Sequence, residues 1–150
     1  MTKGEAMKVE AIAHKREVGA PVQELTSAEV LLDSGVAYDL AGKPGSRQVT
    51  LLSADAWQRV CENMGQEIDW TVRRANILLS GVSFSKGDVG KILQIGELQL
   101  EITKETEPCQ LMDDQVDGLQ AQLAKDWNGG VCSRVIQEAT IRVGDSAHFL

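Results

Sequence analysis

Hydrophobic and polar residues alternate along much of the chain with a two-residue period, which is typical of strands with one buried face. The alternation is clearest where Leu98, Leu100 and Ile102 are separated by polar residues. Segments of this kind, bounded by turn residues, are expected to be strands. They cover residues 7–15, two short pieces within 21–35, 47–52, 73–81, two strands within 87–105 and the last strands within 131–149.

Two segments place apolar residues at helical spacing instead. Residues 54–65 follow Ser53, a good N-cap, and end at Gly65. Residues 113–127 begin with acidic residues, which favour a helix start, and stop at a run of Asn and Gly. The expected buried faces are Trp57, Val60, Cys61 and Met64 in the first helix, and Val116, Leu119 and Leu123 in the second.

Many short strands with few inserted helices indicate a mainly β protein, built as a barrel or a sandwich. A chain of 150 residues without a repeat or a long linker is expected to form one domain over residues 1–150. Its formal charge of −7 argues against nucleic acid or an anionic membrane as the partner, because both would be repelled. No segment resembles a signal peptide or a membrane span, so the cytoplasm is the expected location.

The three cysteines, Cys61, Cys109 and Cys132, form no C-x-x-C pair, and the two histidines lie near opposite ends of the chain. This is neither a zinc-site spacing nor a disulfide framework, so reduced thiols are expected. Cys61 shares the apolar face of its helix and Cys132 opens a strand. Both are therefore expected to be structural.

Cys109 allows two interpretations. It follows Pro108 in a polar stretch between a strand end and a helix start expected near Met112. Such junctions lie at the surface, and a helix start favours a thiolate. Acidic residues on both sides oppose that effect, and free cysteine is also a common core residue. The residues alone leave open whether the sulfur is presented to solvent or packed in the core.

Several arginines lie at or near expected strand starts. Arg73 and Arg74 would lie on opposite faces of an extended segment, so only one of them can point inward. Arg47 ends a glycine-rich loop, and Arg134 follows a pair of glycines. A buried arginine needs a carboxylate or a bound anion, and guanidinium groups suit phosphate. These arginines are either surface charges or the lining of an anion pocket.

A series of short motifs runs in order through the chain: R-Q-V-T-L-L, R-x-N-I, G-D, I-G, L-E-I-T, P-C, G-G-V and V-G-D. In this order and with these gaps, the chain resembles the MOSC domain family. That family is named for the carboxy-terminal domain of molybdenum-cofactor sulfurases, and it also occurs as small stand-alone bacterial proteins. The resemblance extends from about Lys8 to Phe149 and implies a mostly β barrel with a few short helices.

The resemblance also implies a site. The characteristic cysteine of the family corresponds to Cys109, which would carry sulfur as a persulfide or ligate molybdenum. Arg47, Arg74 and Arg134 would bind the phosphate of molybdopterin, the pterin of the molybdenum cofactor, and Asn76 would bind the mixed edge of the pterin. Related proteins bind this cofactor, and some reduce N-hydroxylated compounds.

The chain departs from its relatives in two respects. Many relatives carry a G-D-x-H element, whereas here Tyr38 precedes Asp39 and the histidine is missing. Chemistry that needs this histidine is therefore in doubt. The large sulfurases also carry a pyridoxal-phosphate domain, and no lysine here is placed to hold that cofactor, so pyridoxal phosphate is not expected.

Two functions follow as hypotheses. The first is a molybdenum-cofactor protein, either a binder or the terminal part of a reductase acting on a small-molecule substrate. Its electrons would come from a separate electron-transfer protein, because the sequence has no flavin, haem or iron–sulfur motif. The second is a cofactor-free module that takes sulfur from a sulfur donor, or that binds another protein without catalysis of its own.

Overall fold

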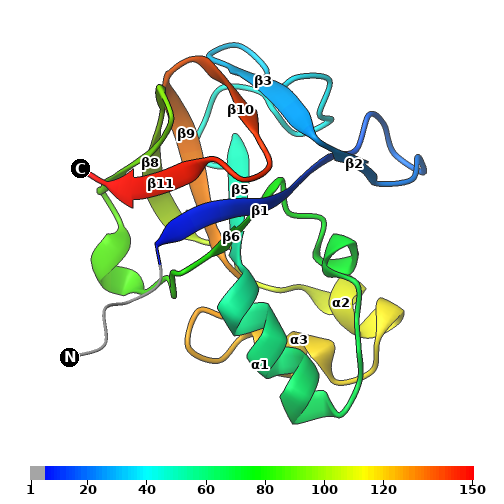
Figure 1. Cartoon of the computed structure of the whole chain (residues 1–150). Helices are drawn as coiled ribbons and strands as arrows, with labels where there is room; N and C mark the ends of the chain where they lie inside the picture. The colour runs from blue at the N-terminus through cyan, green and yellow to red at the C-terminus, as the bar shows by residue number, and fades with distance from the viewer. Residues whose placement is uncertain (1–5) are drawn as a thin grey trace, which may run out of the picture.

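The computed structural model describes residues 6–150 and is mainly β, as expected (Figure 1). Seven strands form one closed barrel, because β11 pairs with β1 as well as with β7. Their order around the barrel is β1 (Met7–His14), β11 (Ser146–Phe149), β7 (Ile92–Ile95), β8 (Leu98–Glu105), β9 (Val131–Gln137), β5 (Val49–Ser53) and β6 (Ile77–Ser80). β5 and β6 are parallel, and the other barrel pairs are antiparallel.

The remaining elements lie outside the barrel. β2 (Gln23–Leu25) pairs with β1, and a small sheet has the order β10 (Ala139–Arg142), β3 (Ser27–Leu31), β4 (Gly35–Val36). The helices are α1 (Ala54–Met64), α2 (Gln110–Gln115) and α3 (Leu119–Leu123), with the 3-10 turns η1 (Trp70–Arg73) and η2 (Lys86–Asp88). Within residues 6–150, no helix is both long and apolar enough to cross a membrane.

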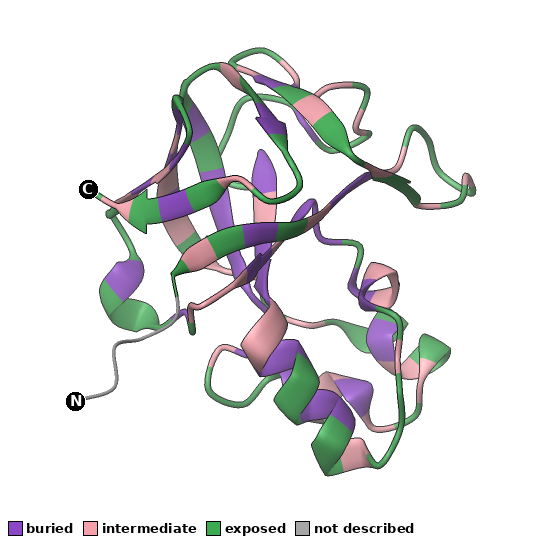
Figure 2. Ribbon diagram, viewed as in Figure 1, coloured by how far each residue is buried: buried purple, intermediate pink, exposed green. Residues whose placement is uncertain are grey.

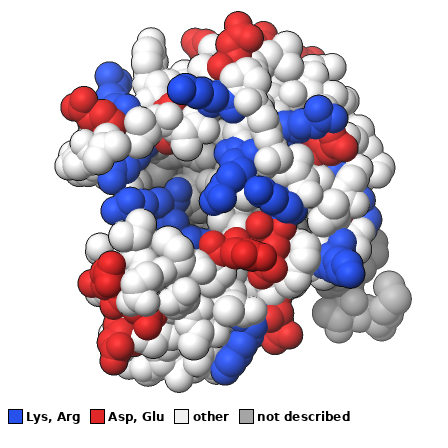
Figure 3. All heavy atoms as spheres, turned by 180° about the vertical axis from the view of Figure 1, so that it is seen from behind, with Lys and Arg blue, Asp and Glu red and all other residues white. Residues whose placement is uncertain are grey.

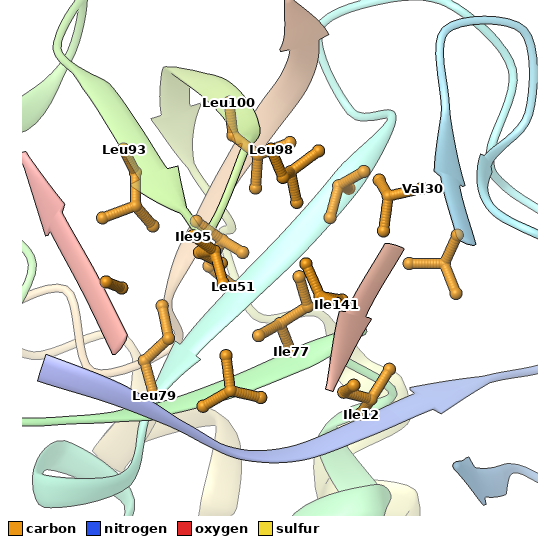
Figure 4. Packing of buried hydrophobic residues seen from close by; sticks show 14 of the residues in the cluster. Ile12, Val30, Leu51, Ile77, Leu79, Leu93, Ile95, Leu98, Leu100 and Ile141 are labelled. Carbon is orange, nitrogen blue, oxygen red and sulfur yellow. The ribbon is translucent and has the colours of Figure 1, made fainter. Parts of the chain in front are cut away.

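The inside of the barrel is a packed core (Figure 4). Leu51 of β5, Ile77 and Leu79 of β6, and Leu93 of β7 point into it and are almost completely buried. Buried and partly exposed residues alternate along β6, β7 and most of β8, as the period-two pattern predicts, whereas β5 is buried at four of its five residues (Figure 2). Because aliphatic side chains fill the interior, a ligand site has to lie outside the barrel.

A second hydrophobic cluster joins the three α-helices to the outer side of the barrel, where Figure 1 shows them gathered at one end. Leu52 of β5, Trp57 of α1, Met112 of α2 and Leu119 of α3 are all buried in this cluster. The cluster fixes the position of α2 relative to β5. It therefore also fixes the segment that carries Cys109.

α1 begins and ends as predicted. The Oγ of Ser53 accepts a hydrogen bond from the N–H of Ala56 at 3.0 Å, which satisfies a helix-end donor. Gly65 ends the helix in the left-handed conformation, with φ of 65°.

Two expected elements are wrong in extent. β6 begins at Ile77 rather than at residue 73, because Arg74 ends η1 with a left-handed φ of 62°. The single helix expected over 113–127 is instead α2 and α3, interrupted at Gly118 with φ of 88°. α2 also starts earlier than expected, directly after Cys109.

Candidate functional site

A cavity of about 320 Å³ lies outside the packed barrel core. Its charged lining residues are Arg47, Arg73, Arg74 and Asp39, three guanidiniums against one carboxylate. Figure 3 shows a hollow in the face opposite to that of Figure 1, with Lys and Arg side chains around it. In a protein of net charge −7, this local excess of positive charge favours an anionic ligand.

Arg73 is the buried arginine of the cavity, with only 8 % of its surface exposed. Its Nε donates to the carbonyl oxygen of Gly129 at 3.0 Å, and its Nη2 donates to that of Thr106 at 2.7 Å. No carboxylate within residues 6–150 forms an ion pair with it. A buried guanidinium that bonds only to neutral carbonyls keeps an uncompensated charge, which favours a bound anion.

The short turn η1 presents this guanidinium. Asp69 caps η1, because its carboxylate accepts from the N–H of Thr71 at 2.9 Å and from its hydroxyl at 2.7 Å. Both hydrogen bonds lower the pKa of Asp69. Arg73 and Arg74 then lie at the end of η1 rather than on a strand, and both line the same cavity.

Two successive glycines lie at this part of the cavity wall: Gly129 lines the cavity beside Arg73, and Gly130 follows it. A Cβ at Gly129 would lie 2.8 Å from the carbonyl oxygen of Thr106 and 3.1 Å from Nη2 of Arg73. A Cβ at Gly130 would lie 2.2 Å from the carbonyl oxygen of Leu51, and φ there is 92°. Only glycine allows the chain to pass so close at both positions.

The charges around Arg73 are coupled. Burial lowers the pKa of Arg73, and Cys109 opposes this most strongly, because negative charge on that thiol would stabilise the guanidinium. Cys132 acts in the same direction, whereas Arg47 repels Arg73 and lowers its pKa further. Burial also raises the pKa of Glu105, which Arg73 partly offsets. The charge of Arg73 is therefore influenced by Arg47 and by both thiols.

Cys109 is exposed, so the core-filler interpretation does not apply to it. It takes the N-cap position of α2, where its carbonyl oxygen accepts from the N–H of Met112 at 3.0 Å. Thr106 lies in the cavity wall three positions earlier in the chain. Cys109 is thus placed on the segment that leaves the cavity toward solvent.

The other two cysteines are buried, as predicted. Cys61 packs among the helices. Cys132 lies behind the cavity wall, with its Sγ 3.3 Å from Oγ1 of Thr106.

Three of the four expected binding residues line the cavity, namely Arg47, Arg74 and Asn76. Arg47 and Arg74 are exposed at its edge. Arg134 does not line the cavity, because its guanidinium pairs with Glu101 on the neighbouring strand at 2.5 Å. The structure therefore brings two of the three expected arginines together and leaves the third apart.

Asn76 connects three strands and is buried. Its Oδ1 accepts from the backbone N–H of Thr50 at 3.0 Å and from its hydroxyl at 3.2 Å, and its Nδ2 donates to the carbonyl oxygen of Ala13 at 3.2 Å. These bonds hold β5 and β1 beside the start of β6. A ligand in the cavity could use only what remains of this amide, namely one N–H.

Asp39 lies where relatives carry the G-D-x-H element. Its carboxylate accepts from the backbone N–H groups of Lys15 at 2.9 Å and Ala41 at 3.2 Å, which fixes the loop around it. Asp39 is shared with a larger cavity of about 800 Å³, whose lining has mixed charges. The smaller cavity is the better candidate because its lining has an excess of positive charge and its wall residue Thr106 lies three positions before Cys109.

Arg73 is the site residue that sequence reasoning missed. The available signal was that only one of Arg73 and Arg74 could point inward. The residue at the family motif position, Arg74, is exposed, and its neighbour Arg73 is the buried one. Within residues 6–150, no three His, Cys, Asp or Glu residues are grouped to hold a metal ion.

The protein is therefore a closed β-barrel with an arginine-lined cavity on its outer side and an exposed cysteine on the segment that follows the cavity wall. The model of the MOSC domain matches residues 31–148, so the chain belongs to the MOSC domain family.

Solved structures with the same fold agree. The chain is similar to the YuaD protein from Bacillus subtilis, with a TM-score of 0.79 and 16% identity over 99% of this chain and 98% of that one. It is also similar to YiiM from Geobacillus stearothermophilus, with a TM-score of 0.74 and 16% identity over 96% of this chain and 75% of that one. YiiM from Escherichia coli gives 0.73 and 11% identity over 95% and 69%. No curated protein matches the chain.

Proposed function

We propose that this MOSC protein carries sulfur or binds the molybdenum cofactor through Cys109, with an anionic group held beside it by Arg47, Arg73 and Arg74. The supporting observation is a buried guanidinium that forms no ion pair in residues 6–150, within the electrostatic range of the exposed Cys109. Cys109 follows the cavity-lining residue Thr106 by three positions. A thiolate is the form of cysteine that attacks sulfur and binds soft metals. The cavity supplies the positive charge that an anionic ligand needs.

The cavity residues fit the molybdenum cofactor. Cys109 would be the soft ligand, Arg73 and Arg47 would bind the phosphate, and the remaining N–H of Asn76 would face the pterin edge. When bound, the molybdenum would supply two-electron chemistry for a small-molecule substrate, with electrons from a separate protein. The residues of this chain would hold and orient the cofactor and exclude water from its anionic end.

The size of the cavity supports the sulfur-carrier form as well. About 320 Å³ is near the lower end for small-molecule sites, so it suits a small anion or one end of a larger ligand. In this form the Cys109 thiolate attacks the outer sulfur of a donor persulfide. The donor S–S bond breaks, a new S–S bond forms at Cys109, and the donor thiolate leaves. No external oxidant or reductant is needed.

Metal and sulfur analysis tests the proposal. The protein is purified from cells that make the cofactor, as wild type, Cys109→Ala and Cys61→Ala. Molybdenum near one per chain that is lost only in Cys109→Ala supports the cofactor form. No metal, but cyanide-labile sulfur on Cys109, supports the carrier form.

Arg74→Ala gives a second readout. It should weaken cofactor retention with little change in melting temperature, because Arg74 is exposed. The proposal is wrong if wild type holds neither metal nor labile sulfur after exposure to cofactor and to a persulfide donor.

A further inference from the structure

We propose that the cavity beside Cys109 binds thiosulfate, and that Cys109 takes the outer sulfur of this anion and releases sulfite. The inference rests on the sulfur-carrier form of the proposed function and names its small-molecule donor. The juxtaposition that carries it is a small arginine-lined cavity with the exposed Cys109 three residues beyond its wall residue Thr106, close enough to influence the charge of Arg73.

The charge of the cavity matches a small dianion. Arg47 and Arg73 line it together, and they lie close enough to repel each other. Like charges held together are costly unless an anion lies between them. Asp39 lowers the net positive charge, but its carboxylate oxygens already accept from two backbone N–H groups. Three guanidiniums and one carboxylate give the lining a net charge of two positive, which Glu105 beside Arg73 reduces, so the cavity carries the excess positive charge that a dianion such as thiosulfate needs.

Burial adds selectivity to this charge. Arg73 is 8 % exposed and held by two carbonyl oxygens, so its orientation is set before a ligand arrives. Arg47 and Arg74 are exposed and can close on the ligand from the edge. A planar guanidinium offers paired N–H donors to two oxygens of a tetrahedral sulfonate, as it does to phosphate.

The reaction balances without a further reagent. The Cys109 thiolate attacks the outer sulfur of thiosulfate, a new S–S bond forms, and the original S–S bond breaks. Both electrons of that bond leave with sulfite, and Cys109 becomes a persulfide. Negative charge develops on the departing sulfonate, where Arg73 and Arg47 would stabilise it. The persulfide then passes to an acceptor thiol or is removed by cyanide as thiocyanate.

The test uses the full chain with reduced thiols, incubated with millimolar thiosulfate. We expect about one sulfite released per chain, a mass increase of one sulfur atom on the peptide with Cys109, and neither in Cys109→Ser. Arg47→Gln should slow loading at least about tenfold, the effect of losing one charge-assisted hydrogen bond. Arg59→Gln is the matched control, because Arg59 is exposed on α1 outside the cavity lining and should leave loading unchanged.

A second donor separates this inference from the function on which it rests. Glutathione persulfide needs no sulfonate pocket, so it should load Cys109 equally in wild type and Arg47→Gln. If it loads Cys109 while thiosulfate gives no sulfite and no mass increase, the thiosulfate inference is wrong and the carrier function stands. If neither donor loads Cys109, both are wrong. Equal thiosulfate loading in wild type and Arg47→Gln would also overturn the assigned role of the cavity.

Competition gives a further test of the cavity. Inorganic phosphate should slow the loading of Cys109 by thiosulfate but not its loading by glutathione persulfide.

Discussion

The Nε of Arg73 lies 3.0 Å from the carbonyl oxygen of Gly129, although the two residues are 56 positions apart in the sequence. This hydrogen bond joins η1 to the turn that precedes β9, and both residues line the cavity. The buried guanidinium can occupy this place only because Gly129 has no side chain. One contact therefore sets both the shape and the charge of the candidate site.

Gly129→Ala should disturb this contact. The added Cβ would lie 2.8 Å from the carbonyl oxygen of Thr106 and 3.1 Å from Nη2 of Arg73, so the chain or the guanidinium has to move. Overpacking of this kind costs about 1–3 kcal/mol in free energy of unfolding, and binding of inorganic phosphate should weaken. Urea unfolding and phosphate titration measure the two effects. Gly87→Ala is the control, because its Cβ meets only a side-chain oxygen at 3.8 Å, and equal stability of the two variants would contradict the prediction.

Cys109 should be the single fast-reacting thiol of the folded protein. An aromatic disulfide reagent should modify about one cysteine per chain quickly, because Cys61 and Cys132 are buried. All three should react after unfolding in guanidinium chloride. Cys109→Ser should lose the fast phase and keep the other two reactions. Two fast thiols in the native protein would contradict the prediction, because Cys61 or Cys132 would then be accessible to the reagent.

Asn76→Ala should destabilise the fold. It removes the side-chain bonds to Thr50 and Ala13 and leaves buried backbone groups without partners, which costs roughly 2–4 kcal/mol. Chemical denaturation measures the loss, with Asn63→Ala on the exposed side of α1 as the control. Unchanged stability combined with lost ligand binding would instead make Asn76 a binding residue only.

Asp69→Ala should give a pH-dependent loss of stability. Its hydrogen bonds to Thr71 lower the pKa of Asp69 in the folded state. Their contribution is complete above the unfolded-state pKa and disappears as the pH falls through the lower folded-state value. Near pH 7 the loss should be about 0.5–1 kcal/mol, typical of an N-cap at an exposed position. Thermal unfolding from pH 7 to pH 2 should show the difference from wild type shrinking, whereas the exposed Glu67→Ala should show no such trend.

Glu105→Gln should stabilise the protein at neutral pH. Burial and then the neighbouring Glu107 raise the pKa of Glu105, so its charged form is disfavoured in the folded state. The folded state holds this proton at a higher pH than the unfolded chain does. The cost of ionised Glu105 therefore appears as the pH rises through the two pKa values and is absent below both. Urea unfolding at pH 7 and pH 3 measures this, with the exposed Glu62→Gln as the control; equal effects at both pH values would contradict it.

The sequence by itself determined the fold class and indicated the candidate cysteine. The alternation of Leu98, Leu100 and Ile102 depends only on which face of a strand is buried, so it correctly predicts β8. The strand pattern left a barrel or a sandwich open, and the resemblance to the MOSC family implied the barrel that the structure confirms. The caps Ser53 and Gly65 act only on the residues next to them, so the sequence also predicts both ends of α1 correctly. The short motifs that resemble the MOSC family indicate Cys109 as the candidate residue, and the structure shows that it is exposed.

Only the tertiary structure decided which arginines meet. A left-handed residue at position 74 turns an expected strand into the end of η1, and it buries Arg73 rather than Arg74. Arg134 of β9 forms an ion pair with Glu101 of the neighbouring strand β8. This pairing depends on the register between the two strands. These outcomes depend on the tertiary structure because they join segments tens of residues apart. A local pattern in the sequence predicts whether a residue is buried, but it does not predict which distant residues it contacts.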